Sequence, residues 1–285
     1  MRKTLMVFLL LLSVSGGPTL AAPSADLWPR WSAHDAQNQE RLDHRGWAEL
    51  LRSYLYVDSD GVNRFAYGKV TEADQEKLEN YLKLMSQVKI SEYNRDVQLA
   101  YWINLYNALT IREILRAYPV DSIRDISPHL FSFGPWDRNQ IVIEGEVLSL
   151  NDIEHRILRP IWQDPRIHYA VNCASIGCPN LQERVFTASS TERMLDRAAR
   201  EFVNHPRGAQ IVDGKLRVSS IYVWFIEDFG DDDAGVIRHL QQYANGELAN
   251  SLREVEEIDN HDYDWRLNSL GGTENAKRKR GRRGS

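Results

Sequence analysis

Apolar residues recur at helical spacing in several long stretches of the chain. From Gln39 to Tyr56 they fall on one face, which predicts an amphipathic helix. From Ser91 to Ala117 they cover more than one face, so we expect this helix to be surrounded by protein. Further helices are predicted for Thr71 to Val88, Thr191 to Val203, Ile221 to Phe229 and Ala234 to Asn245, and for a segment with Glu154 and His155 after a cap at Ser149 or Asn151.

Short extended segments are predicted between the helices. Val57 to Val62, Ile141 to Leu148 and Gln210 to Val218 have the turn residues and alternation of hairpins. The apolar run from Ile167 to Val171 is typical of a buried strand. Because helices dominate and the strands come in hairpins, we expect a helix-rich α+β fold with a small, mainly antiparallel sheet.

The two ends of the chain differ in composition from its middle. Residues 1–21 combine a charged start, a short apolar run and small residues at the exit, which indicates a cleaved signal peptide. We expect residues 22–39 to be a polar lead-in, residues 40–270 to form a single α+β domain, and residues 271–285 to be a disordered basic tail. No later segment approaches the roughly 18 apolar residues that a membrane span requires. We therefore expect an exported protein without a transmembrane segment, in the periplasm or outside the cell.

Charge is distributed unevenly along the chain. The formal net charge is −5, yet six cations lie between Lys277 and Arg283, so the remainder is more acidic than the total indicates. An acidic surface does not bind nucleic acid by neutralising its phosphates, which argues against nucleic acid as a partner. The basic tail is a candidate for contact with anionic surfaces.

Both cysteines of the chain lie in one short stretch, from Arg166 to Leu181. In an exported protein, Cys173 and Cys178 are candidates for a structural disulfide. A free nucleophilic thiol at Cys173 is the alternative. A metal site is disfavoured, because the pair has one nearby histidine and His155 would have to come from another element. We expect no metal and no cofactor.

Cys173, His168 and Glu154 are the residue types of a cysteine-dependent hydrolase or acyl transferase. Such an enzyme needs a thiolate, a histidine that activates it and a third group that orients the histidine. In a strand, positions 168 and 173 face opposite sides because their separation is odd, so a bend near Asn172 is required. The turn that follows Cys173 can supply the bend, and its backbone amides are candidates for an oxyanion site.

Several polar residues are candidates for substrate binding. Asn104 and Asn107 share one face of the long predicted helix, where buried amides either hold neighbouring backbone or line a pocket. The predicted substrate-binding residues are Asn104, Asn107, His155, Asn172 and Ser175. The competing hypothesis is a non-catalytic module that binds a peptide, a glycan or another envelope component. Its pocket is expected to be formed by the helix with Asn104, the helix with Glu154 and the stretch with the two cysteines, which would then be bridged.

Five segments resemble, in this order, the domain-of-unknown-function 547 family. They are Tyr101–Ala108, Leu150–His155, Ile167–Ser175 with Gly177–Pro179, Asp228–Gly230 and Tyr263–Asn268. The resemblance extends from about residue 54 to residue 268. It implies a single-domain outline and the positions of a site, and it implies no particular reaction.

Overall fold

The computed structural model describes residues 22–126 and 134–271. The predicted signal peptide at 1–21 and nearly all of the basic tail, 272–285, lie outside these residues. In the described part of the chain, no helix is both long and apolar enough to cross a bilayer.

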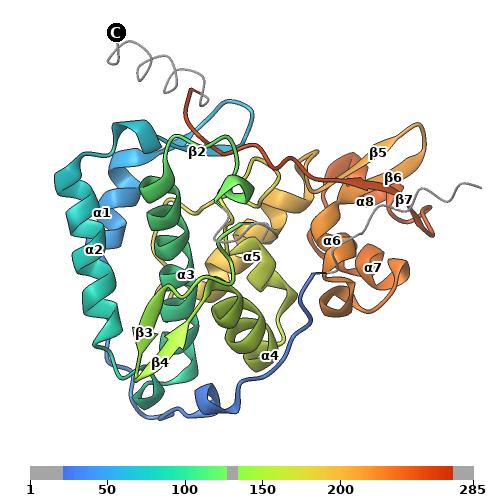
Figure 1. Cartoon of the computed structure of the whole chain (residues 1–285). Helices are drawn as coiled ribbons and strands as arrows, with labels where there is room; N and C mark the ends of the chain where they lie inside the picture. Colours follow the sequence, from blue (N-terminus) through green and yellow to red (C-terminus); the bar gives the residue numbers. More distant parts are fainter. Residues whose placement is uncertain (1–21, 127–133, 272–285) are drawn as a thin grey trace, which may run out of the picture.

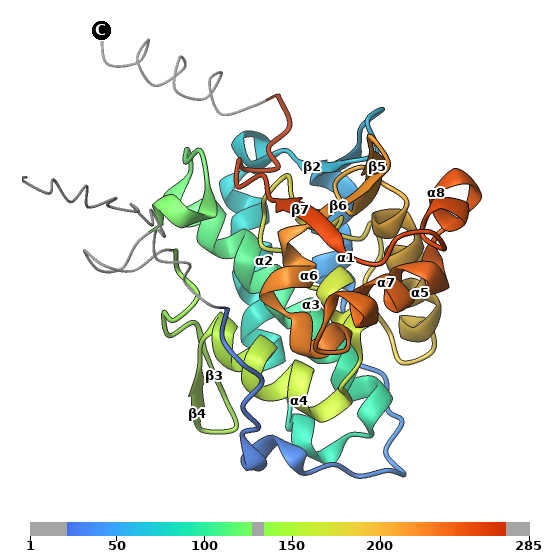
Figure 2. The same cartoon turned by 90° about the vertical axis from the view of Figure 1, so that its right-hand side faces the viewer.

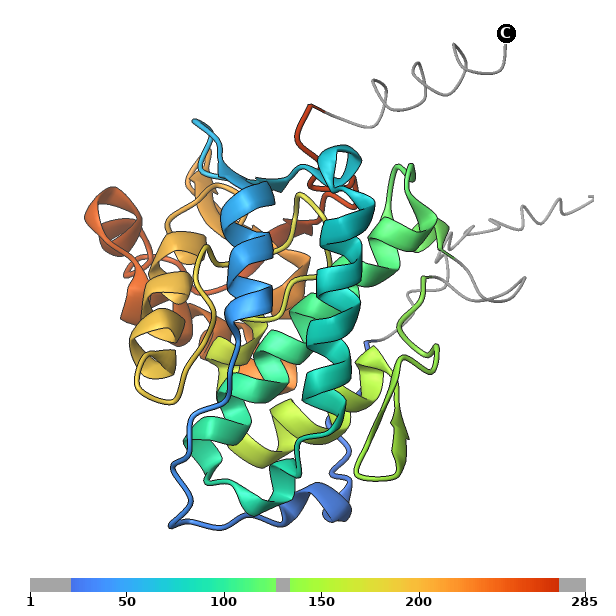
Figure 3. The same ribbon diagram turned by 90° about the vertical axis from the view of Figure 1, so that its left-hand side faces the viewer.

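Three long helices pack together on one side of the molecule (Figure 1), and their bounds are α1 (Arg45–Tyr54), α2 (Glu72–Ser86) and α3 (Arg95–Ala117). The Thr71 side chain accepts a hydrogen bond from the Asp74 amide, which caps α2 as its sequence predicts. Helix α3 is buried on every face from Val97 to Ile114, as its apolar pattern predicts. Figure 3 shows α1 (blue) and α2 (teal) side by side on the face opposite β7.

Short strands in the described residues form three small sheets with mostly antiparallel pairing, which confirms the expected α+β fold. The predicted hairpins are present. A strand that the sequence did not predict, β7, pairs with β6 in parallel. The strands are β1 (Leu55–Val57), β2 (Asn63–Phe65), β3 (Ile141–Ile143), β4 (Glu146–Leu148), β5 (Ala209–Val212), β6 (Lys215–Ser219) and β7 (Ile258–Asp262).

The apolar run from Ile167 to Val171 is not a strand, so that prediction is wrong. Pro165–Tyr169 instead form the 3-10 helix η6. Pro165 begins this helix with a fixed φ, and the Asp164 side chain accepts a hydrogen bond from the Arg166 amide. A short buried apolar run is compatible with a strand or a helical turn, and the residues before it decide the outcome.

The remaining helices connect and cover these elements. Helix α5 has the predicted bounds, whereas the predicted helix from Ile221 to Phe229 is divided into α6 and η7. In chain order they are η1 (Pro29–Ser32), η2 (Tyr67–Lys69), η3 (Ile90–Glu92), η4 (Ile123–Asp125), the π-helix η5 (Asp152–Leu158), α4 (Arg159–Trp162), α5 (Thr191–Val203), α6 (Ser220–Trp224), η7 (Ile226–Phe229), α7 (Asp233–Tyr243) and α8 (Gly246–Ser251).

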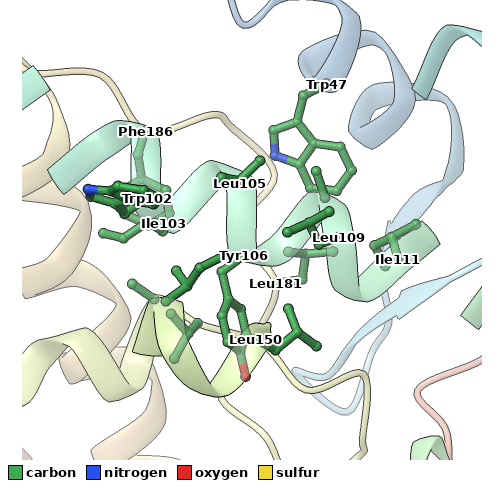
Figure 4. Packing of buried hydrophobic residues seen from close by; sticks show 14 of the residues in the cluster. Trp47, Trp102, Ile103, Leu105, Tyr106, Leu109, Ile111, Leu150, Leu181 and Phe186 are labelled. Atoms are coloured by element: carbon green, nitrogen blue, oxygen red, sulfur yellow. The ribbon is translucent and has the colours of Figure 1, made fainter. Parts of the chain in front are cut away.

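Buried side chains of the described residues form two hydrophobic clusters. The larger cluster packs around α3, and Figure 4 shows Trp102 and Tyr106 within it. The smaller cluster joins α5, α6 and α7 to the three-stranded sheet, on the face shown in Figure 2. Helix η6 contributes Ile167 to the larger cluster and Tyr169 to the smaller one. Because each fully buried large apolar side chain contributes about 1.5–3 kcal/mol, η6 is fixed firmly at the junction between the two clusters.

Candidate functional site

The loop from Asn172 to Pro179 carries both cysteines and is held in place by side-chain amides. Asn107 on α3 donates to the Ala170 carbonyl oxygen and accepts a hydrogen bond from the Asn172 amide. Asn172 in turn accepts from the Ala174 N–H and donates to the Pro179 carbonyl oxygen. Both asparagine side chains therefore fix the backbone of this cysteine loop, which accounts for their burial.

Asn104 holds a different segment in the same way. Its Nδ2 donates to the Phe186 carbonyl oxygen at 2.8 Å, and its Oδ1 accepts from the Phe186 N–H at 3.0 Å. Two roles were expected for Asn104 and Asn107, either holding neighbouring backbone or lining a pocket. These hydrogen bonds correspond to the first role. The substrate-binding role predicted for them stays a prediction.

Backbone geometry sets the shape of the cysteine loop. Ala174 has a φ of 62°, in the left-handed region that non-glycine residues rarely adopt, and it turns the chain directly after Cys173. Ser175 then forms an isolated antiparallel bridge with Leu267. At Gly177 the loop approaches the C-terminal segment so closely that an added Cβ would lie 2.7 Å from the backbone nitrogen of Asp264. Glycine is required there because no side chain fits.

Hydrogen-bond donors surround the Cys173 sulfur. Its Sγ lies 3.0 Å from Tyr263 Oη, 3.2 Å from Ser175 Oγ and 3.4 Å from Cys178 Sγ. The Ser175 N–H also donates to it. The Tyr263 and Ser175 hydroxyls lie 2.8 Å apart, so one can donate to the other while the second donates to sulfur. Donors in these positions favour the charged form of a thiol.

Because of these contacts, the two cysteines differ in the pKa of their thiols. The hydrogen bond from Cys178, together with those from Ser175 and Tyr263, outweighs burial and lowers the pKa of Cys173 to about 7. Burial, and then the hydrogen bond with Cys173, raises the pKa of Cys178 well above its usual value. Cys173 is partly exposed and Cys178 is buried. At pH 7 about half of Cys173 is therefore in the thiolate form, while Cys178 remains a thiol.

His168 belongs to a second polar group. Its Nε2 lies 2.6 Å from Asp228 Oδ2, and its Nδ1 lies 3.9 Å from Glu154 Oε1. Arg159 donates to the same Asp228 oxygen at 2.6 Å, and the His168 ring stacks on Phe225. Although burial alone would raise it, hydrogen bonds from His168 and Arg159 lower the pKa of Asp228 to about 2. An ionised Asp228 therefore fixes the orientation of the imidazole.

Glu154 and His155 lie on the π-helix η5, an unusual element that is frequent at functional sites. His155 is buried, its Nδ1 lies 3.0 Å from the Arg159 guanidinium, and burial lowers its pKa. Tyr106 extends from α3 toward η5, with its hydroxyl oxygen at the far end (Figure 4). Burial, followed by the nearby charges of Glu154 and Cys173, raises the pKa of Tyr106. Tyr106 therefore lies near both the histidine group and the cysteine group.

The predicted catalytic residues lie in these two neighbouring groups. Glu154 lies close to His168, and Cys173 contacts Ser175. Among the hydrogen bonds and ion pairs of the described residues, none joins His168 to Cys173. The catalytic roles of all three residues stay predictions.

The amides of the cysteine loop, which were candidates for an oxyanion site, already have partners. Ala174 N–H donates to Asn172, Ile176 N–H to the Arg266 carbonyl, Gly177 N–H to the Asp264 carbonyl and Cys178 N–H to the Ser175 carbonyl. An oxyanion site at these amides therefore requires a rearrangement of the loop. In residues 22–126 and 134–271, no three histidine, cysteine or acidic side chains gather as metal ligands would.

Three residues of the site were absent from the predicted set. Tyr263 reaches the sulfur from the end of β7, and Asp228 reaches His168 from η7. Arg207 donates to the carbonyl oxygens of Ile176 and Cys178 at 2.6 and 2.8 Å. Tyr263 and Asp228 lie in segments that carry the family resemblance, which was the available signal. Nothing in the sequence around Arg207 marks its role.

Comparisons with known proteins give one match. Residues 90–203 match the model of a family described as "Protein of unknown function, DUF547". This range includes η5 and the cysteine loop, and it is shorter than the resemblance from 54 to 268, so Asp228 and Tyr263 lie beyond it. Neither the curated proteins nor the solved structures gave a match. The segment of residues 90–203, which holds His168 and both cysteines, therefore belongs to the DUF547 family.

Proposed function

We propose that this chain is a cysteine-dependent hydrolase or acyl transferase in which Cys173 is the nucleophile. The observation that carries the proposal is the set of donors around the Cys173 sulfur, which holds its pKa at about 7 while the residue stays partly exposed. The thiolate is the nucleophilic form of cysteine, whereas a structural cysteine among apolar groups has a raised pKa.

In the proposed reaction, the Cys173 thiolate attacks the carbonyl carbon of an ester, thioester or amide. A carbon–sulfur bond forms, and the leaving group departs with a proton from Tyr263, whose hydroxyl lies 3.0 Å from the sulfur. The acyl group remains on Cys173 as a thioester. Water, or a second nucleophile, then cleaves the thioester, and its proton restores the Tyr263 hydroxyl.

His168 and Glu154 act in the second half of this reaction. Because the pKa of Cys173 is already about 7, the sulfur needs no adjacent base to become a thiolate. Glu154 lies 3.9 Å from the His168 ring. We assign these residues to relaying the proton of the attacking nucleophile during cleavage of the thioester, the proton that restores the Tyr263 hydroxyl, with Asp228 orienting the histidine.

The expected signal peptide extends the proposal to location and substrate. An exported protein meets peptides, glycans and other envelope components, and acyl groups on these molecules are the proposed substrates. The basic tail is proposed to hold the protein near anionic surfaces.

A non-catalytic binding module is the second candidate. Two observations favour it: the loop amides are occupied by other partners, and a cavity of about 410 Å³ lies between segments around residues 39–44, 94–100 and 187–189. This volume is in the range of small-molecule sites, and no cysteine lines the cavity. In this case Cys173 and Cys178 would form a structural disulfide that pins the loop.

The activated ester p-nitrophenyl acetate distinguishes the two candidates. The reduced full chain is mixed with the ester, nitrophenolate release is followed, and the intact mass is measured after an acid quench. We expect one acetyl group on the wild type and on Cys178→Ser, and none on Cys173→Ala. Equal nitrophenolate release by wild type and Cys173→Ala, without an acetyl group on Cys173, would overturn the proposal and favour the binding module. Thermal unfolding of each variant confirms that it is folded.

A further inference from the structure

The two sulfurs of the cysteine loop are placed to react with each other. Cys173 Sγ and Cys178 Sγ lie 3.4 Å apart. Because a disulfide bond is about 2.0 Å long, an approach of about 1.4 Å closes it. The surrounding backbone is anchored, since Arg207 donates to the carbonyl oxygens of Ile176 and Cys178. Closure therefore requires movement of side chains more than of the loop.

The environments of the two sulfurs differ in the way that sequential thiol exchange requires. Cys173 is partly exposed and receives hydrogen bonds from Tyr263 and Ser175, so it is the thiolate that an external disulfide meets first. Cys178 is buried, and its sulfur accepts a hydrogen bond from the Cys173 N–H at 3.2 Å. It is shielded from external reagents and adjacent to the only atom it needs to attack.

We propose that Cys173 and Cys178 form a dithiol–disulfide couple that exchanges with a low-molecular-weight disulfide. The Cys173 thiolate attacks one sulfur of the external disulfide, so a mixed disulfide forms and one external thiolate leaves. Cys178 then loses its proton to that thiolate and attacks the Cys173 sulfur. The Cys173–Cys178 bond forms and the second external thiolate leaves. The external disulfide is reduced by two electrons, and the pair of cysteines is oxidised by two.

This couple goes beyond acyl transfer, because it needs no acyl substrate. It rests on the proposed function, because the same Cys173 thiolate acts in both reactions. In the closed disulfide the Cys173 sulfur is no longer a thiolate. Acyl transfer therefore stops when the pair is oxidised and resumes when an external thiol reduces the bond.

The test uses the full chain in buffers that contain glutathione and glutathione disulfide in a series of ratios. Samples are quenched with acid, free thiols are alkylated, and intact mass separates dithiol, internal disulfide and mixed disulfide. The wild type should pass from dithiol to internal disulfide as the buffer becomes more oxidising, and back again. Cys178→Ser and Cys178→Ala should stop at the mixed disulfide on Cys173, because the resolving thiol is gone. Cys173→Ser, the matched control, should remain unmodified because Cys178 is buried.

Other outcomes contradict the couple. A wild type that accumulates the mixed disulfide as Cys178→Ser does would show that Cys178 does not resolve it. A dithiol that persists in the most oxidising buffer, or a disulfide that persists in the most reducing one, would show an inert pair or a structural bridge. Equal modification of Cys178→Ser and Cys173→Ser would contradict the proposal that Cys173 reacts first and Cys178 second. Because this test needs no ester and the ester test needs no oxidant, either proposal can fail alone.

Discussion

At the level of single residues, the chemistry of the loop depends on what surrounds the Cys173 sulfur. The sequence predicted activation by His168, whereas the sulfur contacts two hydroxyls and a second thiol. Hydroxyl donors stabilise a thiolate without taking its proton, so a nucleophile of this kind is ready before substrate arrives. His168 instead pairs with Asp228.

Replacing Tyr263 by Phe removes one donor and keeps the ring. A hydrogen bond to a charged group contributes about 1.5 kcal/mol, which is about one pKa unit, so the pKa of Cys173 should rise by about one unit. Alkylation of Cys173 by iodoacetamide at pH 6 should slow about tenfold. Tyr222→Phe, which also loses a buried hydroxyl, is the control, since Tyr222 bonds to Tyr169 and not to the sulfur. An unchanged rate in Tyr263→Phe would show that this hydroxyl does not stabilise the thiolate.

Replacing His168 by Asn separates activation of the sulfur from later proton transfer. Since no hydrogen bond among the described residues joins the imidazole to the sulfur, the midpoint of Cys173 alkylation against pH should stay at about 7. Hydrolysis of the acetyl group on Cys173, followed by intact mass, should slow at least about tenfold, as general acid–base catalysis contributes that much or more. A midpoint that moves toward that of a free thiol, with the fold intact, would mean that His168 activates Cys173 directly.

At the level of elements, the cysteine loop is a mostly buried segment that other parts of the chain hold in place at three points. Asn107 on α3 holds its beginning, Arg207 holds its end, and the segment after β7 pairs with its middle. Each contact joins residues far apart in the sequence. The loop therefore depends on long-range packing for the geometry that its chemistry needs.

Arg207→Gln should loosen the end of this loop. Two carbonyl oxygens would lose a charged donor, which should lower the free energy of unfolding by about 1–3 kcal/mol. Transient opening of the loop should also increase alkylation of the buried Cys178 in native conditions, measured by peptide mass. Arg200→Gln on α5 is the control, because its guanidinium lies over the Tyr243 ring and should change stability by no more than about 0.5 kcal/mol. Equal effects of both variants would exclude a specific role for Arg207.

The sequence predicted those elements whose signals are local. Helix α5 and the Thr71 cap follow from apolar period and capping chemistry within one segment. The error at η6 arose because a short apolar run does not distinguish a strand from a helical turn. Strand β7 and the pairing of His168 with Asp228 depend on contacts between distant segments, which no local pattern encodes. Local patterns in the sequence therefore indicated the candidate site residues but not the partners of their side chains.

At the level of the whole molecule, the two hydrophobic clusters bury titratable groups as well as apolar ones. Burial lowers the pKa of His44 to about 4, and it lowers the pKa of His239 to about 4. Each ring is hydrogen-bonded to a tyrosine hydroxyl, His44 to Tyr81 and His239 to Tyr169. Both histidines are therefore folded into the core in the neutral form.

We therefore expect the folded protein to lose stability in mild acid. The pKa of each histidine in the folded state lies below the unfolded value of about 6.5, so the unfolded state binds more protons between these two values. The free energy of unfolding should thus be highest above pH 6.5 and fall as the pH drops toward 4. Each pKa unit of difference corresponds to about 1.4 kcal/mol. His44→Gln, which takes up no proton, should flatten the decline in free energy of unfolding between these pH values, measured by denaturant titration. His34→Gln, at an exposed position, is the control and should decline as the wild type does. A wild-type stability that is flat over this range would contradict the assignment.

The pH dependence of Cys173 alkylation tests the central claim most directly. The reduced, native full chain is treated with iodoacetamide over a series of pH values, and the rate is measured by intact mass, with Cys173→Ser as the blank. We expect modification of Cys173 alone, with a midpoint at about pH 7. A midpoint near the free-cysteine value of about 8.5, or a native protein whose cysteines do not react, would contradict it.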